Sequence, residues 1–301
     1  MGQNSLDVNE LYILYKPYFI SIVYKMLGSI SDAEDIVHDT FIKLQMKEVH
    51  LTDINNIKSY VSRMIVNRCI NDLQSSRKKR ETYVGTWLPE PIVQDVQWDP
   101  SEKIIQDDQL SYTFVVLMEK LSATERAVYV LKEALDLKHN EIADLLNITE
   151  INCRKVFSRA KKKMNVSFDE EEYTPYEIQQ DQITRFISAL SRGNVQEISE
   201  TLTSDVTLIA DGGGNVATAI NQIISKKRVL SLLSAIATKF FTGKKAQAVT
   251  VNNQPGVLIL KDEEVVGVFS FAWKQNSNQI EQIFYVVNPD KLKHIIIHSK
   301  L

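Results

Sequence analysis

No stretch of this 301-residue chain is apolar for long enough to cross a membrane, and its first residues lack the basic-then-apolar pattern of a secretory signal. The chain has only two cysteines, Cys69 and Cys153, which lie far apart and form no CxxC pair. We therefore expect reduced thiols in a cytoplasmic protein with no membrane partner. The net charge is only −3, so any binding to nucleic acid must depend on local clusters of charge.

Signatures of catalysis are also missing. DGGGN, residues 211–215, lacks the GK[ST] of a phosphate-binding loop. HIIIH, residues 294–298, has the spacing of a metal-binding pair on a helix but lacks the glutamate of HExxH, so two unrelated histidines are favoured. Asp205, Asp211 and Tyr285 are polar candidates, but nothing pairs them as acid and base. We expect no enzyme, no catalytic residue, no metal and no cofactor.

Apolar residues at helical spacing predict two all-helical domains, residues 1–86 and residues 107–168. Between them, residues 87–106 predict a linker, because its prolines fit neither a helix interior nor a central strand. Trp87 and Trp98 are too apolar for a linker that stays in solvent, so we expect it to lie against a protein surface.

Residues 169–301 predict an α+β domain. Two helical patterns come first, followed by a strand that ends in glycines, a longer helix, and four strands separated by short polar turns. Helices followed by such a meander favour a curved, mostly antiparallel sheet wrapped round a helix.

The segment from His139 to Met164 predicts a helix-turn-helix. Asn147 suits the left-handed residue that ends its first helix, and Thr149 can cap the second. An apolar stripe faces inward in that second helix. This leaves a polar and basic outer face made of Glu150, Asn152, Arg154, Lys155, Ser158, Arg159 and Lys162. Such a face suits the major groove and the flanking phosphates of DNA.

Two further helices carry opposite charges. The helix expected from about residue 56 to residue 80 mixes basic side chains with an aromatic one, which suits single-stranded bases pulled from a duplex. The preceding helix is acidic, and Ser31 with Glu34 predicts a capping box at its start. We expect its other carboxylates to face a basic partner, namely Asp32, Asp35 and Asp39.

The three elements together resemble sigma-70-family initiation factors. DAEDIVHDTFIKL, residues 32–44, resembles the polymerase-binding helix of region 2, and the next helix is similar to the one that melts the −10 element. The helix-turn-helix resembles region 4, which reads the −35 element. With no region 3 domain between them, the resemblance is to the extracytoplasmic-function class.

This resemblance implies a role for each surface. The clamp helices of the largest subunit of core RNA polymerase would bind Asp32, Asp35 and Asp39. The −10 strand would contact Asn55, Asn56, Lys58, Tyr60, Ser62, Arg63 and Asn67, with the basic cluster Arg77, Lys78, Lys79 and Arg80. The −35 duplex would contact Asn152, Arg154, Lys155, Ser158, Arg159 and Lys162. His38 stands where the family often has a neutral amide, and Tyr60 replaces a common tryptophan.

The second half resembles the SnoaL-like domains of the nuclear-transport-factor-2-like superfamily. Three motifs resemble the signature of sigma factors with a fused domain of this kind that regulates them. They are WLPEP (Trp87, Leu88, Pro89, Glu90, Pro91), DGGGN (Asp211, Gly212, Gly213, Gly214 and Asn215) and NPDK (Asn288, Pro289, Asp290, Lys291). Asn215 replaces the usual lysine. The glycines either permit a tight turn or let another segment approach closely, with Asp211 accepting its donors.

These features predict a sigma factor that directs promoter-specific initiation and is modulated by its own C-terminal domain. Its partners would be core RNA polymerase and promoter DNA, with a small ligand in the C-terminal pocket favoured over an enzyme. One alternative is a one-component helix-turn-helix regulator with a ligand-sensing domain. Another is a cyclase or isomerase with a DNA-binding appendage. The acidic helix and the second basic helix disfavour the one-component regulator.

Overall fold

The computed structural model describes residues 7–46, 57–94, 111–164, 175–240, 243–274 and 277–296. The chain divides into two compact units. The first, called here the helical unit, consists of residues 1–81, 99–108 and 115–167. The second, the sheet unit, consists of residues 82–98, 109–114 and 168–301, so the segment after the first domain is part of the sheet unit.

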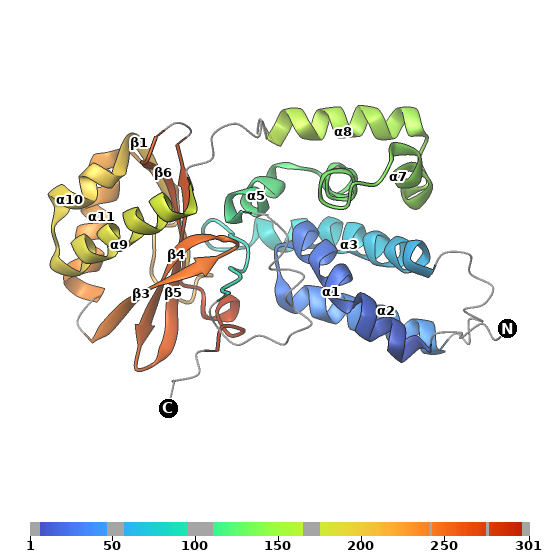
Figure 1. The fold of residues 1–301 in the computed structure, drawn as a ribbon, viewed down its shortest axis with the longest axis horizontal. Helices are drawn as coiled ribbons and strands as arrows, with labels where there is room; N and C mark the ends of the chain where they lie inside the picture. The colour runs from blue at the N-terminus through green and yellow to red at the C-terminus, as the bar shows by residue number, and fades with distance from the viewer. Residues whose placement is uncertain are drawn as a thin grey trace. The chain divides into compact units, whose positions relative to one another are not determined.

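The helical unit begins with α1 (Val8–Leu27), α2 (Ile30–Met46) and α3 (Ile57–Glu81), which pack against one another (Figure 1). The start of α2 differs from the prediction that Ser31 caps this helix. The helix already begins at Ile30, so Ser29 is in the capping place and its Oγ accepts a hydrogen bond from the backbone N–H of Asp32 at 3.1 Å.

Short helical segments make up the rest of the helical unit. The chain forms α5 (Tyr112–Leu117), which starts in the sheet unit, then a 3₁₀ turn η3 (Met118–Lys120) and α6 (Ala123–Tyr129). A π-helical turn, η4 (Val130–Ala134), leads to α7 (His139–Leu146) and α8 (Glu150–Met164). No helix within the described ranges has the length and apolar character that crossing a membrane requires.

The sheet unit has the predicted α+β architecture. Helices α9 (Tyr176–Arg192), α10 (Val195–Thr201) and α11 (Lys226–Phe240) accompany six strands in the order β2-β1-β6-β5-β4-β3 (Figure 1). The strands are β1 (Leu202–Asp211), β2 (Ile223–Ile224), β3 (Lys244–Val251), β4 (Gln254–Lys261), β5 (Glu264–Trp273) and β6 (Ile280–Val286), followed by a 3₁₀ turn, η5 (Pro289–Lys291). The prediction of a mostly antiparallel sheet is confirmed, and only β1 and β6 pair in parallel among the described strands.

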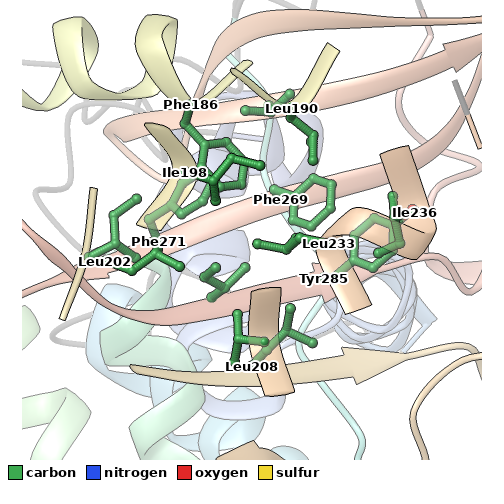
Figure 2. Packing of buried hydrophobic residues seen from close by; sticks show 14 of the residues in the cluster. Phe186, Leu190, Ile198, Leu202, Leu208, Leu233, Ile236, Phe269, Phe271 and Tyr285 are labelled. Carbon is green, nitrogen blue, oxygen red and sulfur yellow. The ribbon is translucent and has the colours of Figure 1, made fainter. Parts of the chain in front are cut away.

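Aromatic rings fill the space between this sheet and its helices (Figure 2). The rings of Phe269 and Tyr285 stack with their centroids 4.0 Å apart and their planes inclined by only 5°. Phe186 of α9 packs edge-on against Phe271, with ring centroids 5.4 Å apart. Burial raises the pKa of Tyr285, so its hydroxyl stays protonated in this apolar interior.

The opposite face of the sheet and its β3 edge contact residues that come before α9 in the sequence. Neighbouring strand residues point to opposite faces, so Phe284 points away from the side of Tyr285. Its ring meets that of Tyr112, with centroids 5.5 Å apart. Val93 forms an isolated bridge with Val251 on β3, the edge strand. The sheet unit therefore incorporates residues 82–98 and 109–114, which come before its main part, residues 168–301, in the sequence.

Candidate nucleic-acid interface and linker network

The helix-turn-helix has the predicted geometry. Asn147 adopts the left-handed conformation with φ 53°, and the hydroxyl of Thr149 accepts a hydrogen bond from the N–H of Asn152 at 3.2 Å. The inner side of α8 is buried and carries Cys153, Val156 and Ala160. All six expected −35 residues are exposed on its outer side, namely Asn152, Arg154, Lys155, Ser158, Arg159 and Lys162. This places a basic face on the second helix of the motif.

The acidic helix presents its carboxylates to solvent. Asp32, Asp35 and Asp39 are all exposed on α2, while Ala33 and Val37 are fully buried. Residues three and four apart share one face of a helix, so the three carboxylates form a single negative stripe. Such a stripe can receive a basic partner without rearrangement of the core.

The expected −10 residues on α3 fall into different environments. Lys58 and Asn67 are exposed, and the ammonium of Lys58 lies 3.8 Å from the ring centroid of Tyr18. Tyr60 is half-buried. Ser62 is buried and its hydroxyl donates to the carbonyl of Lys58 at 2.8 Å, so its side chain is not available on the surface. Asn55, Asn56 and the side chains of Arg77, Lys78, Lys79 and Arg80 lie outside the described part of the structure.

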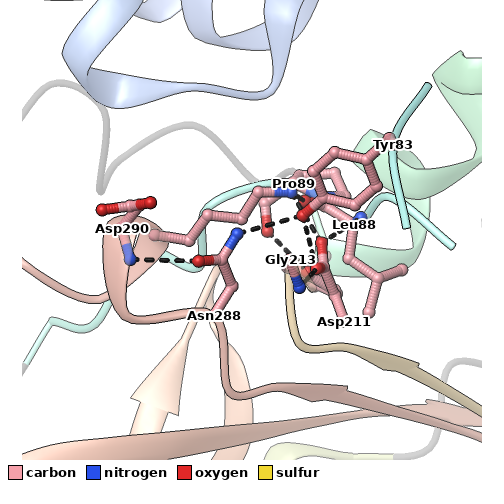
Figure 3. Close-up of polar contacts among 9 residues, drawn as sticks. Tyr83, Leu88, Pro89, Asp211, Gly213, Asn288 and Asp290 are labelled. Atoms are coloured by element: carbon pink, nitrogen blue, oxygen red, sulfur yellow. Dashed lines mark hydrogen bonds and ion pairs between the residues drawn. The ribbon is translucent and has the colours of Figure 1, made fainter. Parts of the chain in front are cut away.

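In the sheet unit, the Asp211 carboxylate is the centre of a buried set of hydrogen bonds, called here the linker network (Figure 3). Its Oδ1 accepts the hydroxyl of Tyr83 at 2.6 Å and the N–H of Gly213 at 3.0 Å. Its Oδ2 accepts the N–H of Leu88 at 2.8 Å and the ammonium of Lys291 at 2.7 Å. One carboxylate at the end of β1 thus binds the segment 83–88, its own glycine turn and the NPDK motif.

Lys291 supplies the positive charge in this network. Its ammonium also donates to the carbonyl of Leu88 and lies 4.0 Å from the ring centroid of Trp87. The side chains of Lys291 and Asp211 are 8% and 0% exposed, so the pair is screened from water. Asn215, where the resemblance implies a lysine, is exposed, and the charge of Asp211 is balanced by Lys291.

The glycines of DGGGN serve both purposes that the sequence left open. The turn is tight, since the N–H of Asn215 donates to the carbonyl of Gly212 at 3.0 Å. Gly213 has φ +62°, and a Cβ there would come within 2.3 Å of the Asn288 Nδ2. A side chain at this position would therefore displace Asn288, whose Nδ2 hydrogen-bonds the Tyr83 hydroxyl at 3.0 Å.

Three comparisons with known proteins identify the modules. The chain is 24% identical over 294 residues to the ECF RNA polymerase sigma factor SigJ of Mycobacterium tuberculosis, covering 95% of this chain and 93% of that protein. It is 26% identical over 289 residues to the probable ECF sigma factor SigI of the same species, covering 95% and 94%. The crystal structure of SigJ shares the fold with a TM-score of 0.73 at 22% identity, covering 95% of this chain and 98% of that one. The model of sigma-70 region 2 matches residues 11–79, and that of sigma-70 region 4 matches residues 113–164.

The chain is an extracytoplasmic-function sigma factor. Region 2 of this sigma factor comprises α1, α2 and α3, while region 4 comprises η3 to α8 with most of α5. The sheet unit is a further domain fused to them, with the α+β architecture expected from the resemblance to SnoaL-like domains, and the two regions are joined through a segment that belongs to this unit.

Sequence reasoning missed several residues of the linker network in this sigma factor. Tyr83 lies outside the WLPEP motif, yet burial and its hydrogen bond to the Asp211 carboxylate raise its pKa and keep it a donor. Tyr112 donates to the carbonyl of Pro89 at 2.7 Å, and a ring nitrogen of His294 lies 2.9 Å from the carbonyl of Pro91. The two tyrosines have no motif around them. Only their proximity in the fold reveals their roles.

Replacing Arg154 of the sigma factor by alanine is expected to weaken binding of the holoenzyme to promoter DNA by about 1–3 kcal/mol if the guanidinium makes a bidentate contact with a base. In the free protein Nε and Nη2 of Arg154 both donate to Oε1 of Glu150, at 3.1 and 2.6 Å, so this exposed pair would have to open for such a contact. Gel-shift titration measures the affinity. An unchanged affinity would remove Arg154 from the interface, and Lys161→Ala, an exposed residue outside the expected set, serves as control.

Proposed function

We propose that this sigma factor joins core RNA polymerase through the acidic stripe of α2 and directs it to promoters through α3 and α8. The observation that carries this proposal is the presence of regions 2 and 4 in family order, with the acidic stripe of α2 and the basic face of α8 exposed and with Lys58, Arg63 and Asn67 exposed on α3. Charged surfaces guide association, while contacts in the groove provide sequence selectivity. Promoter recognition would then depend on the polymerase that holds the two regions.

We further propose that the SnoaL-like domain regulates initiation through the segment between regions 2 and 4. Leu88, Ile92 and Val93 of that segment are at most 3% exposed. The N–H of Asn252 donates to the carbonyl of Ile92 at 2.8 Å, and the N–H of Gln94 donates to the carbonyl of Thr250 at 3.0 Å. Because the connection between the two DNA-binding regions is built into the domain, the domain controls how far they can separate. The mechanism needs no small ligand.

Transcription in vitro tests both proposals. Core polymerase with the full chain is expected to initiate from selected genomic fragments, whereas core polymerase alone is not. Deleting the residues after Met164 is expected to change the amount of transcript. The deletion exposes the apolar segment 88–93 and releases the connection between regions 2 and 4 from the domain. Equal output from the full and shortened chains would contradict regulation by the domain. Tight binding of promoter duplex by the protein without polymerase would instead favour a one-component regulator.

A further inference from the structure

Arg126 of region 4 reaches into region 2. It lies on α6 with only 3% of its surface exposed, and its Nη1 donates to the carbonyl of Met26 at the end of α1 at 2.6 Å. The same nitrogen is 2.8 Å from the carboxylate of Glu119. Burial lowers the pKa of Arg126 to about 10, and its Nε–H has no hydrogen-bond partner among the described residues. The buried guanidinium is therefore held both by Glu119 of its own region and by the end of a helix from the other region.

Arg63 makes the converse contact from region 2 to region 4. It is exposed on α3, and its Nε donates to the carbonyl of Leu145 at 3.1 Å, while its Nη2 donates to the carbonyl of Asp144. Both carbonyls belong to the last turn of α7, the first helix of the helix-turn-helix. In agreement with these bonds, α3 packs against both α6 and α7.

The two contacts use the same physical feature. The last carbonyls of a helix lack partners within the helix and carry its partial negative charge, so a cation there is stabilising. The left-handed cap of α1 uses the carbonyl of Tyr24, and that of α7 uses the carbonyl of Ala143. The carbonyls of Met26, Asp144 and Leu145 are left for arginines from the opposite region.

We propose that Arg63 and Arg126 form a reciprocal clasp that holds regions 2 and 4 together in the free protein, each arginine capping a helix of the other region. The effect of this clasp on promoter binding rests on the proposed function. Arg63 is one of the residues expected to bind the −10 strand, and the Nε–H and Nη2–H groups that bind the α7 carbonyls are not available to DNA at the same time. The clasp therefore withholds part of the −10 surface until polymerase separates the regions.

The distance between the two regions tests the clasp without polymerase or DNA. Spin labels at Lys43→Cys on α2 and Lys161→Cys on α8 would report it by pulsed electron resonance. Both positions are exposed, whereas the native Cys69 and Cys153 are fully buried and protected from labelling. One narrow distance is expected for the otherwise unchanged chain. Arg63→Gln and Arg126→Gln should each raise the ratio of open to closed molecules about tenfold, since each removes hydrogen bonds from a charged donor.

Arg68→Gln is the matched control, because Arg68 also lies on α3 and, among the residues that the structure describes, its ion pair is with Asp72 of the same helix at 2.9 Å. Its distance distribution should stay unchanged. Arg63 is exposed, so Arg63→Gln keeps the test valid even if Arg126→Gln prevents folding of region 4. The same distribution for Arg63→Gln and the unchanged chain would overturn the clasp, as would an equal opening in Arg68→Gln. Either failure would leave polymerase binding untouched, and loss of polymerase binding would not affect this result.

Discussion

Changing Asp35 to arginine is expected to abolish binding of core RNA polymerase while leaving region 2 folded. Asp35 is exposed in the middle of the acidic stripe, whereas its neighbours Ile36 and Val37 are buried. The substitution therefore replaces attraction to a basic partner by repulsion without altering the core, and opposed like charges cost several kcal/mol. A pull-down with purified core enzyme, with circular dichroism to verify folding, measures the effect.

Glu34→Arg provides the matched control for this experiment. Glu34 is also exposed on α2, so the change in charge is the same. A helix turns by about 100° per residue, so Glu34 points away from the stripe formed by Asp32, Asp35 and Asp39. Binding by this control should be weakened far less. If Asp35→Arg still binds polymerase as well as the unchanged chain does, the assignment of this stripe to the polymerase is wrong.

Replacing Asp211 by alanine is expected to destabilise the sheet unit by about 3–5 kcal/mol and to release the segment 83–94. Removing one partner of a buried ion pair leaves the other charge buried and uncompensated, which accounts for an effect of this size. The substitution also deprives Tyr83 and Leu88 of their acceptor. Urea unfolding of the full chain would measure the change in stability, and limited proteolysis would report exposure of the segment.

Asp290→Ala is a suitable control because Asp290 belongs to the same NPDK motif as Lys291, and the change breaks only an ion pair with Lys293 in which both side chains are exposed. Exposed pairs contribute about 0–1 kcal/mol, so this variant should unfold nearly as the unchanged chain does. Adding Lys291→Met to Asp211→Ala should recover part of the loss, since the double variant leaves no buried charge at this pair. Equal stability of Asp211→Ala and Asp290→Ala would show that the linker network does not hold the segment.

Much of the helical part was predictable because its determinants are local. The helix-turn-helix could be placed from the sequence because its caps involve backbone groups only a few residues away. Asn147 ends the first helix in the left-handed conformation, and Thr149 caps the second. The acidic stripe followed from helical spacing alone. The same local rule predicted Ser31 as the cap of α2, and this prediction is wrong. Ser29 and Ser31 are both suitable capping residues near the start of this helix, and the folded chain uses Ser29.

Side chains that depend on distant neighbours were less predictable. Ser62 has the polarity and spacing of a surface residue, but its side chain is buried. Its hydroxyl donates a hydrogen bond to the carbonyl of Lys58, one turn earlier in α3. The glycines of one signature motif suggested that another segment could approach closely, with Asp211 accepting its donors. They did not indicate that Tyr83 and Lys291 would share one carboxylate, because these residues are separated from Asp211 by 128 and 80 positions.

The sequence by itself determined the order of the modules, the type of each element and the charge of each exposed helix face, since these depend on residues within one or two turns of one another. Only the tertiary structure decided which polar groups meet: Asp211 with the segment 83–88, Arg126 with the end of α1, and Arg63 with the end of α7. Such pairs arise when packing brings remote backbone groups together, and local periodicity carries no information about that meeting.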